Sequence, residues 1–192
     1  MSGAVIRPQR REEPALCEGS VVIRPMRKED LPQAAGIERI CFSQEAWSEK
    51  VYREEFAHAG TYLWLWCAVA RKARKGAASS GVPSENFSDM QGESDVPVGT
   101  ISLTRTGDVG EIGNVAVLPE YRGQGIAGAL LETALGYGKR QQGMSLFTLE
   151  VRAGNAAAIH LYESAGFRTE GLRPRFYTDP VEDARIMWKR DA

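Results

Sequence analysis

The segment 115–131 (VAVLPEYRGQGIAGALL) carries the strongest chemical signal in the sequence. A strand-like stretch runs into a turn that contains Gly123 and Gly125, and a helix-like stretch follows directly. The small residues leave space at the start of the helix, so its first backbone amides can point at an anion, and Arg122 adds a positive charge. The pattern predicts a phosphate or pyrophosphate site. Tight packing of the strand against the helix explains the same glycines equally well.

A second interpretation of this turn is a dinucleotide site, because residues 123–128 match the pattern GxGxxG and Glu150 lies near the end of the next predicted strand. Two features argue against it. Residues 118–122 separate the strand from the first glycine, and too few residues follow Glu150 to build the second half of a doubly wound sheet. We therefore do not expect a dinucleotide-binding fold.

Glu150 lies on the polar side of a predicted strand at 145–151 (SLFTLEV), where apolar and polar residues alternate. This alternation lets the carboxylate project into a cleft at the end of the strand. A plain surface carboxylate that pairs with Arg152 is the alternative left open by the pattern. Asn155 then caps a predicted helix, and Tyr162 follows two helical turns later on the same side.

The predicted elements alternate in a way that argues for a single α/β (α+β) domain. Helices are expected at 28–41, from Ser48 to about Gly60, at 125–141 and at 155–165. Strands are expected at 21–26, 62–70, 96–104, 109–117, 145–151, 167–172 and 184–189. Adjacent strands mixed with strand–helix–strand crossovers predict one mixed seven-stranded sheet with helices on both faces.

The 192 residues include 24 Lys and Arg against 25 Asp and Glu, which gives a formal net charge of −1. With no basic excess, the composition argues against a nucleic-acid partner. Hydrophobic residues make up 43% of the chain, which is typical of a globular domain with a sizeable core and excludes a disordered or collagen-like chain. We expect one domain over residues 20–192.

Cys17, Cys41 and Cys67 are an odd set, spaced too widely for zinc ligands, which favours a reducing, intracellular compartment. The longest apolar run, 62–70, is well short of the roughly 20 residues that cross a bilayer as a helix, so no membrane partner is expected. Residues 1–19 carry arginines and glutamates where a signal peptide needs an apolar stretch. We therefore expect a mobile N-terminal tail and a cytoplasmic protein.

Residues 71–95 (RKARKGAASSGVPSENFSDMQGESD) are rich in Ser, Gly and charge and almost lack large apolar side chains. We expect a disordered loop insertion between two strands of the domain. Its RKARK cluster fits a contact with an acidic partner, and a solvated linker inside a hairpin is the simpler interpretation.

The motif Arg122-x-x-Gly125-x-Ala127 resembles the acetyl-CoA signature of the GNAT superfamily of N-acetyltransferases, which reads Arg or Gln, two residues, Gly, one residue, then Gly or Ala. The segment 149–167 (LEVRAGNAAAIHLYESAGF) is similar almost residue for residue to the bacterial N-terminal alanine acetyltransferases that modify a small-subunit ribosomal protein. The chain therefore resembles this branch of the superfamily.

Residues 46–50 and 182–187 also resemble that family, so the likeness spans roughly residues 20–190 and leaves out the tail and the insertion. Two departures are visible. The family usually has Pro where this chain has Ala46, and the connection 177–182 is shorter than in the best-known members. Both positions border the expected peptide site, so they bear on the substrate rather than on the acetyl donor.

The resemblance implies the GNAT acyl-CoA N-acyltransferase fold and an enzyme that transfers an acetyl group from acetyl-CoA to the N-terminal α-amine of a protein, releasing coenzyme A. A ribosomal protein that begins with alanine or another small residue is the implied substrate. An α-amine has a pKa near 8 and a lysine near 10.4, so an α-amine needs only a modest base. By the resemblance, Glu150 is the general base and Tyr162, protonated at neutral pH, is the general acid.

The resemblance also assigns binding residues. The backbone of 115–117 is expected to pair with the pantetheine arm of the coenzyme, and Asn155 to contact it as well as cap its helix. Trp47 and Tyr177 are expected to wall the peptide entrance, although either fits a core position. The complete set of expected cofactor contacts is Val115, Ala116, Val117, Arg122, Gly123, Gln124, Gly125, Ile126, Ala127, Gly128 and Asn155.

Two other functions fit the same residues. One is a GNAT enzyme that acetylates a lysine side chain or a small amine, and the other is a non-catalytic acyl-CoA-binding module that docks through its basic loop. The presence of both Glu150 and Tyr162 argues against the module. His58 and His160 are isolated on predicted helices without the neighbours that a metal site needs, so no metal is expected.

Overall fold

The computed structural model describes residues 4–6, 21–42, 45–71 and 95–190. Its strands are β1 (Ala4–Ile6), β2 (Val21–Pro25), β3 (Leu63–Arg71), β4 (Asp95–Thr106), β5 (Val109–Val117), β6 (Leu146–Arg152), β7 (Arg168–Thr178) and β8 (Val181–Arg190). Its helices are η1 (Lys28–Asp30), α1 (Leu31–Cys41), α2 (Glu49–Phe56), η3 (Pro119–Tyr121), α3 (Ile126–Gln142) and α4 (Ala156–Ser164).

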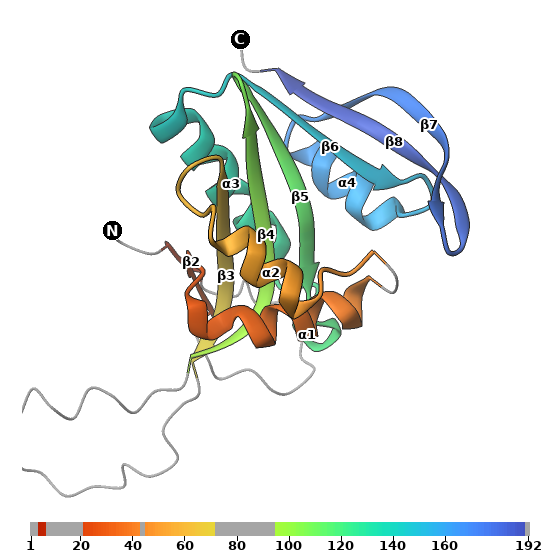
Figure 1. The fold of residues 1–192 in the computed structure, drawn as a ribbon. Helices are drawn as coiled ribbons and strands as arrows, with labels where there is room; N and C mark the ends of the chain where they lie inside the picture. The colour runs from red at the N-terminus through yellow and green to blue at the C-terminus, as the bar shows by residue number, and fades with distance from the viewer. Residues whose placement is uncertain (1–3, 7–20, 43–44, 72–94, 191–192) are drawn as a thin grey trace, which may run out of the picture.

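One mixed sheet of eight strands runs through the molecule in the order β1-β2-β3-β4-β5-β6-β8-β7. The β5–β6 pair is parallel and the other pairs are antiparallel. Helices α1 and α2 cover one face of the sheet, and α3 and α4 cover the other (Figure 1). The expected mixed sheet with helices on both faces is confirmed.

The structure differs from the expectations at two edges of the sheet. Residues 4–6, inside the segment expected to be a mobile tail, form an eighth strand that pairs with β2. Strand β7 continues to Thr178 instead of ending at Leu172, because a register shift between Arg173 and Tyr177 lets it pair with β8 again after an interruption. The rest of the tail and residues 72–94 of the insertion lie outside the described residues.

Strand β3 separates two hydrophobic cores, which explains why its sequence is an unbroken apolar run. Trp64 and Trp66 belong to the core beneath α3, where both rings contact Tyr137 at centroid distances of 5.5 and 5.3 Å. Leu65 and Cys67 belong to the core beneath α1 and α2. A strand buried on both faces has no polar side, so alternation is absent from its sequence.

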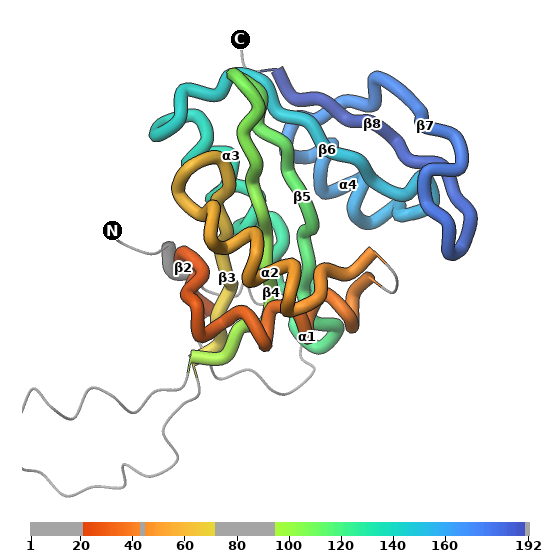
Figure 2. Tube along the Cα trace, in the orientation of Figure 1, coloured from red at the N-terminus to blue at the C-terminus, as the bar shows by residue number. Residues whose placement is uncertain are grey.

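A β-bulge in β5 determines where β5 and β6 separate. Ile101 of β4 lies opposite Val115 and Leu103 lies opposite Ile112, so Gly113 and Asn114 together oppose a single residue of β4. Such an extra residue bends its strand. The parallel pairing of β5 with β6 ends just before the bulge, at Glu111 and Thr148, and beyond it the two strands diverge (Figures 1 and 2).

The carboxylate of Glu38 ties the bulge to the helices on its face of the sheet. Glu38 is 1% exposed and accepts hydrogen bonds from Asn114 Nδ2 at 2.7 Å, the Tyr52 hydroxyl at 3.1 Å and the Trp47 backbone N–H at 3.3 Å. Burial raises the pKa of Glu38 above its usual range, and the three donors offset only part of that effect. Three segments of the chain thus depend on one buried acid.

We predict that Glu38→Gln lowers the free energy of unfolding by about 1–3 kcal/mol, because the amide nitrogen cannot accept a hydrogen bond from Asn114 or Trp47. The raised pKa means that folded Glu38 holds its proton more tightly than the unfolded chain does, so the stability it contributes is greatest at low pH. Denaturant unfolding should show the gap between wild type and variant shrinking as the pH rises from about 4 to about 8.

The control is Glu54→Gln, an exposed α2 residue paired with Lys50 at 3.9 Å, which should change stability by less than about 0.5 kcal/mol. A gap for Glu38→Gln that widens with rising pH would contradict the account of Glu38.

Candidate active site

The turn before α3 is open and lacks a side-chain cap. Gly123 and Gly125 have φ values of 75° and 76°, in the left-handed region that favours glycine, and a Cβ atom at either would meet no atom within 4 Å. Gly125 is the N-cap of α3 and has no side chain to satisfy the amides of the first turn. Those amides are left for solvent or a ligand, as the sequence analysis expected of an anion site.

Arg122 reaches back from this turn to the end of β5. Its Nε donates to the carbonyl oxygen of Val117 at 3.0 Å, and its Nη2 lies 3.7 Å from Cys41 Sγ at the end of α1. The Cys41 thiol also contacts the Val117 carbonyl, at 3.4 Å. The guanidinium therefore lies beside the turn and fixes the end of β5, so its positive charge adds to the field of the helix N-terminus.

Glu150 projects from β6 on the side away from the α3 core. The predicted alternation holds, because Phe147, Leu149 and Val151 are buried beneath α3 and α4. The Glu150 carboxylate pairs with Arg173 of β7 at 2.8 Å, rather than with Arg152 as the surface-carboxylate alternative supposed. Both side chains line a hollow of about 460 Å³, together with Glu111, Thr148, Leu149, Ile186 and Trp188.

Tyr162 and Tyr177 extend this neighbourhood on the α4 side. Tyr162 of α4 is 7% exposed, and its ring lies edge-on to Phe167 at a centroid distance of 6.0 Å. Burial, with a smaller contribution from the nearby Tyr177, raises the pKa of Tyr162 to about 12. Burial is also the largest cause that raises the pKa of Tyr177. The charge of Arg152 lowers this pKa, and nearby carboxylates, Glu150 among them, raise it further. Tyr177 is thus within electrostatic reach of both Glu150 and Tyr162.

The remaining predicted residues have clear structural roles. Asn155 caps α4 by accepting a hydrogen bond from the Ala158 N–H at 3.1 Å, and its side chain is exposed. Trp47 is half-buried, with its ring edge-on to Tyr52 at 5.3 Å, so it packs against the α1–α2 core. The backbone of 115–117 pairs with β4 on one side only. In the described residues no strand covers its other edge.

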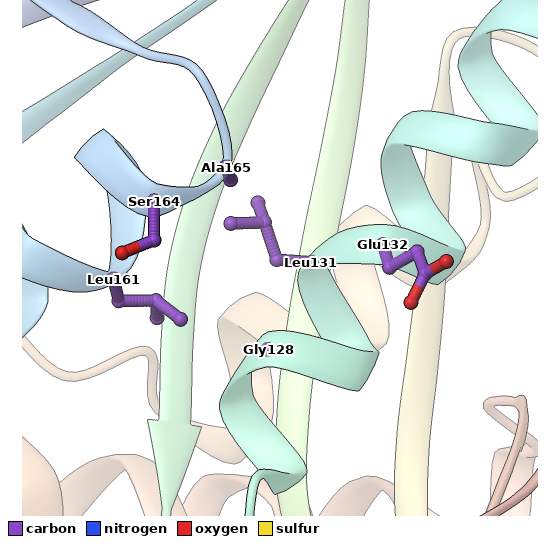
Figure 3. Close-up of a pocket in the computed structure, with 6 residues that line it drawn as sticks. All are labelled: Gly128, Leu131, Glu132, Leu161, Ser164 and Ala165. Carbon is purple, nitrogen blue, oxygen red and sulfur yellow. The ribbon is translucent and has the colours of Figure 1, made fainter.

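A second hollow of about 370 Å³ lies between α3 and α4 (Figure 3). Gly128, Leu131 and Glu132 line it from α3, and Leu161 faces them from α4, with Ser164 and Ala165 at the end of that helix. Gly128 belongs to the first turn of α3, so this hollow begins beside the open amides. A Cβ atom at Gly128 would lie 3.7 Å from Leu161, which shows how closely the helices approach.

The described residues contain no group of three or more His, Cys, Asp or Glu side chains arranged to hold a metal ion. None of the helices described is both long enough and apolar enough to cross a membrane.

Sequence reasoning missed Arg173 and the two carboxylates that pair with Arg152, which are Glu45 and Glu182. Arg173 lies beyond the point where β7 was expected to end, so no strand pattern placed it opposite Glu150. The partners of Arg152 come from segments far away in the sequence, and no local spacing relates them. The family resemblance at 182–187 was the one available signal for Glu182.

Comparison with known proteins gives a consistent result. The acetyltransferase (GNAT) family model matches residues 39–167, which is more than half of the chain. The [ribosomal protein bS18]-alanine N-acetyltransferase of Escherichia coli is 49% identical over 76 residues, 38% of this chain and 51% of that protein. The N-alpha-acetyltransferase RimI of Mycobacterium tuberculosis is 39% identical over 82 residues, 43% of this chain and 49% of that protein. The chain thus spans about half the length of these curated relatives.

Solved structures match over more of the chain. The ribosomal-protein-S18-alanine N-acetyltransferase from Escherichia coli has a TM-score of 0.66 and 30% identity, covering 88% of this chain and 93% of that one. A NatC complex bound to Gag peptide and CoA has a TM-score of 0.65 and 27% identity, covering 90% of this chain and 99% of that one.

We predict opposite effects for two glycine substitutions. Gly125→Ala should lower the free energy of unfolding by about 1–2 kcal/mol, because alanine is strained at a φ of 76°. Gly36→Ala, inside α1 with no atom within 4 Å of the added Cβ, should raise it by about 0.5–1 kcal/mol. Denaturant unfolding of both variants measures this, and equal effects would show that alanine is not strained at position 125.

Proposed function

The chain belongs to the acetyltransferase (GNAT) family, and from its site we propose that it transfers the acetyl group of acetyl-CoA to the N-terminal α-amine of a protein. The GNAT fold implied by the sequence resemblance is confirmed by the family match and the solved structures. The observation that carries the proposal is the divergence of β5 and β6 with Glu150 on one of those strands and the open α3 turn after the other.

Acetyl-CoA fits the residues present. Its diphosphate needs several donors and a positive field, and the uncapped amides of 124–128 with Arg122 supply both. Its pantetheine arm carries amides that need backbone partners, and the edge of 115–117 that faces away from β4 offers them. The hollow between α3 and α4 adjoins the same amides, so it can receive part of the nucleotide. When bound, the coenzyme supplies an acetyl group activated as a thioester.

The reaction requires one proton to leave the amine and one to reach the sulfur. Glu150 accepts the proton that the α-amine nitrogen loses as it forms the new C–N bond. The C–S bond breaks, and the coenzyme sulfur receives a proton from the Tyr162 hydroxyl, which burial keeps protonated at neutral pH. The products are an acetylated N-terminus and coenzyme A, and solvent returns the two catalytic groups to their starting states.

The ion pair of Glu150 with Arg173 constrains this role. One oxygen of the carboxylate is held at 2.8 Å by a guanidinium that is about half exposed, and both side chains line the hollow that would receive the amine. A guanidinium keeps its charge at any relevant pH, so it steadies the carboxylate without competing for the proton. The arrangement suits a base that needs only to deprotonate an α-amine.

The substrate that we propose is a ribosomal protein with an N-terminal alanine, met in the cytoplasm. Support comes from relatives named for this activity on protein bS18, one of which matches nearly its whole solved chain at 30% identity. We propose that Tyr177, whose ring lies beneath Arg152, and Trp47, whose ring packs against Tyr52, flank the entrance for the peptide.

We predict that Glu150→Gln and Tyr162→Phe each lower kcat by about 10²-fold or more, while calorimetry shows acetyl-CoA affinity within about 3-fold of wild type. Both substitutions nearly preserve side-chain size and remove the proton transfer, and Glu150→Gln also removes the charge that pairs with Arg173. The control Glu163→Gln changes an exposed α4 residue beside Tyr162 and should leave kcat unchanged. Wild-type kcat in both catalytic variants would reject the acid–base assignment.

We predict that the α-amine is the acetylated group. Peptides that begin with alanine should gain one acetyl group at the N-terminus by mass spectrometry, and the same peptides with a blocked N-terminus should gain none, even where they contain lysine. Acetylated lysine or polyamine as the main product would replace this function with the second GNAT activity considered above. Acetyl-CoA binding without any product would indicate a binding module.

A further inference from the structure

Arg152 makes more polar contacts than any acid or base used in the proposed chemistry. It follows Glu150 by two residues on the same side of β6 and does not pair with it. Its Nη2 donates to Glu45 Oε1 and to the Asp179 carbonyl oxygen, the latter at 3.0 Å. Its Nη1 donates to Glu182 Oε2 and to the Pro180 carbonyl oxygen, both at 3.1 Å. One guanidinium thus joins the α1–α2 connection to the β7–β8 hairpin.

The same guanidinium also lies over the ring of Tyr177, 4.1 Å from its centroid. This stacking fixes the ring plane, because a planar cation attracts an aromatic face best when it lies directly over it. Tyr177 pairs with Glu182 across the hairpin, so the ring and the carboxylate are held by one backbone register and one side chain. Glu182 also accepts a hydrogen bond from the Gly154 N–H, which ties the hairpin to the turn before α4.

We propose that Arg152 is a positioning residue for the peptide N-terminus: it fixes the separation between the segment of Glu45 and Trp47 and the ring of Tyr177. We call Glu45, Arg152, Tyr177 and Glu182 the entrance clasp. This inference rests on the proposed function, since Arg152 lies two residues after the proposed base Glu150 on the same side of β6. Arg152 touches no reacting atom and sets the place where the first residue of the substrate enters.

The chemistry of the clasp favours a positioning role for Arg152 over a purely structural one. Arg152 is only 22% exposed, so its four hydrogen bonds exchange little with water and hold their geometry. The two carboxylates that it neutralises belong to different segments, so neither segment reaches this position by its own secondary structure. Lysine is a point charge without the planar fork, and it cannot hold two carboxylates, two carbonyls and a ring at once.

The test is Arg152→Met, which keeps an unbranched apolar stem and removes the fork. Relative to wild type, we expect KM for an alanine-terminated peptide to rise about 10-fold or more, with kcat within about 3-fold and acetyl-CoA affinity within about 2-fold. Hydrogen exchange of backbone amides should accelerate at 45–48 and at 177–182 together. Arg152→Lys should reverse less than half of the rise in KM that Arg152→Met causes.

The matched control is Arg190→Met. Arg190 also holds a carboxylate, Glu170, with two bonds of 2.8 Å, and its guanidinium lies 5.3 Å from the centroid of the Trp188 ring, but it lies at the other end of β8. We expect KM within about 2-fold of wild type and no faster exchange at either clasp segment.

The outcomes distinguish a failure of the clasp from a failure of the proposed function. A raised KM with faster exchange at both segments supports the clasp. Faster exchange with unchanged KM would mean that the clasp is only a structural link. A raised KM without faster exchange would mean that Arg152 acts directly on the peptide. Either result overturns the inference, and so does a variant in which neither KM nor exchange changes. If wild type acetylates no N-terminus, the proposed function fails, and the exchange data alone decide whether the clasp joins the two segments.

Discussion

The site depends on the β-bulge in β5, where two residues lie opposite a single residue of β4. Gly113 and Asn114 bend β5 away from β6 immediately after their last paired residues, Glu111 and Thr148. Without that bend, parallel pairing would continue and the edge of 115–117 would be covered by β6. The bulge is itself held in place, because Asn114 donates to the buried Glu38. The packing of α1 and α2 is therefore linked to the shape of the site.

Electrostatics near the divergence is divided between arginines with separate tasks. Arg122 fixes the end of β5 beside the open turn, Arg173 holds Glu150, and Arg152 joins the segments around Tyr177. In the mechanism that we propose, the proton transfers fall instead to Glu150, which lines the hollow, and to Tyr162, whose pKa is raised by burial.

Short sequence patterns predicted the helix caps and turns that depend on neighbouring residues. Ser48 and Asn155 cap the helices that they were expected to cap, and the glycine-containing turn directly precedes α3 as expected. The divergence of β5 and β6 was not predicted, because a bulge appears only as pairing between two strands. The partner of Glu150 was wrong in the surface alternative for the same reason: Arg173 follows a register shift of β7 against β8 between Thr169 and Gly171, which no local pattern shows. No pattern marked Glu38, whose donors come from residues 47–52 and from Asn114 in β5.

Amide hydrogen exchange of the wild-type chain, with and without acetyl-CoA, tests the central claim most directly. If the coenzyme lies between the diverging strands and against the start of α3, its binding should slow exchange at 113–117 and 124–128 and leave β2 and β3 unchanged. Protection confined to other segments, or none at saturating coenzyme, would contradict the account, since the open edge of β5 and the uncapped turn would then have no part in binding.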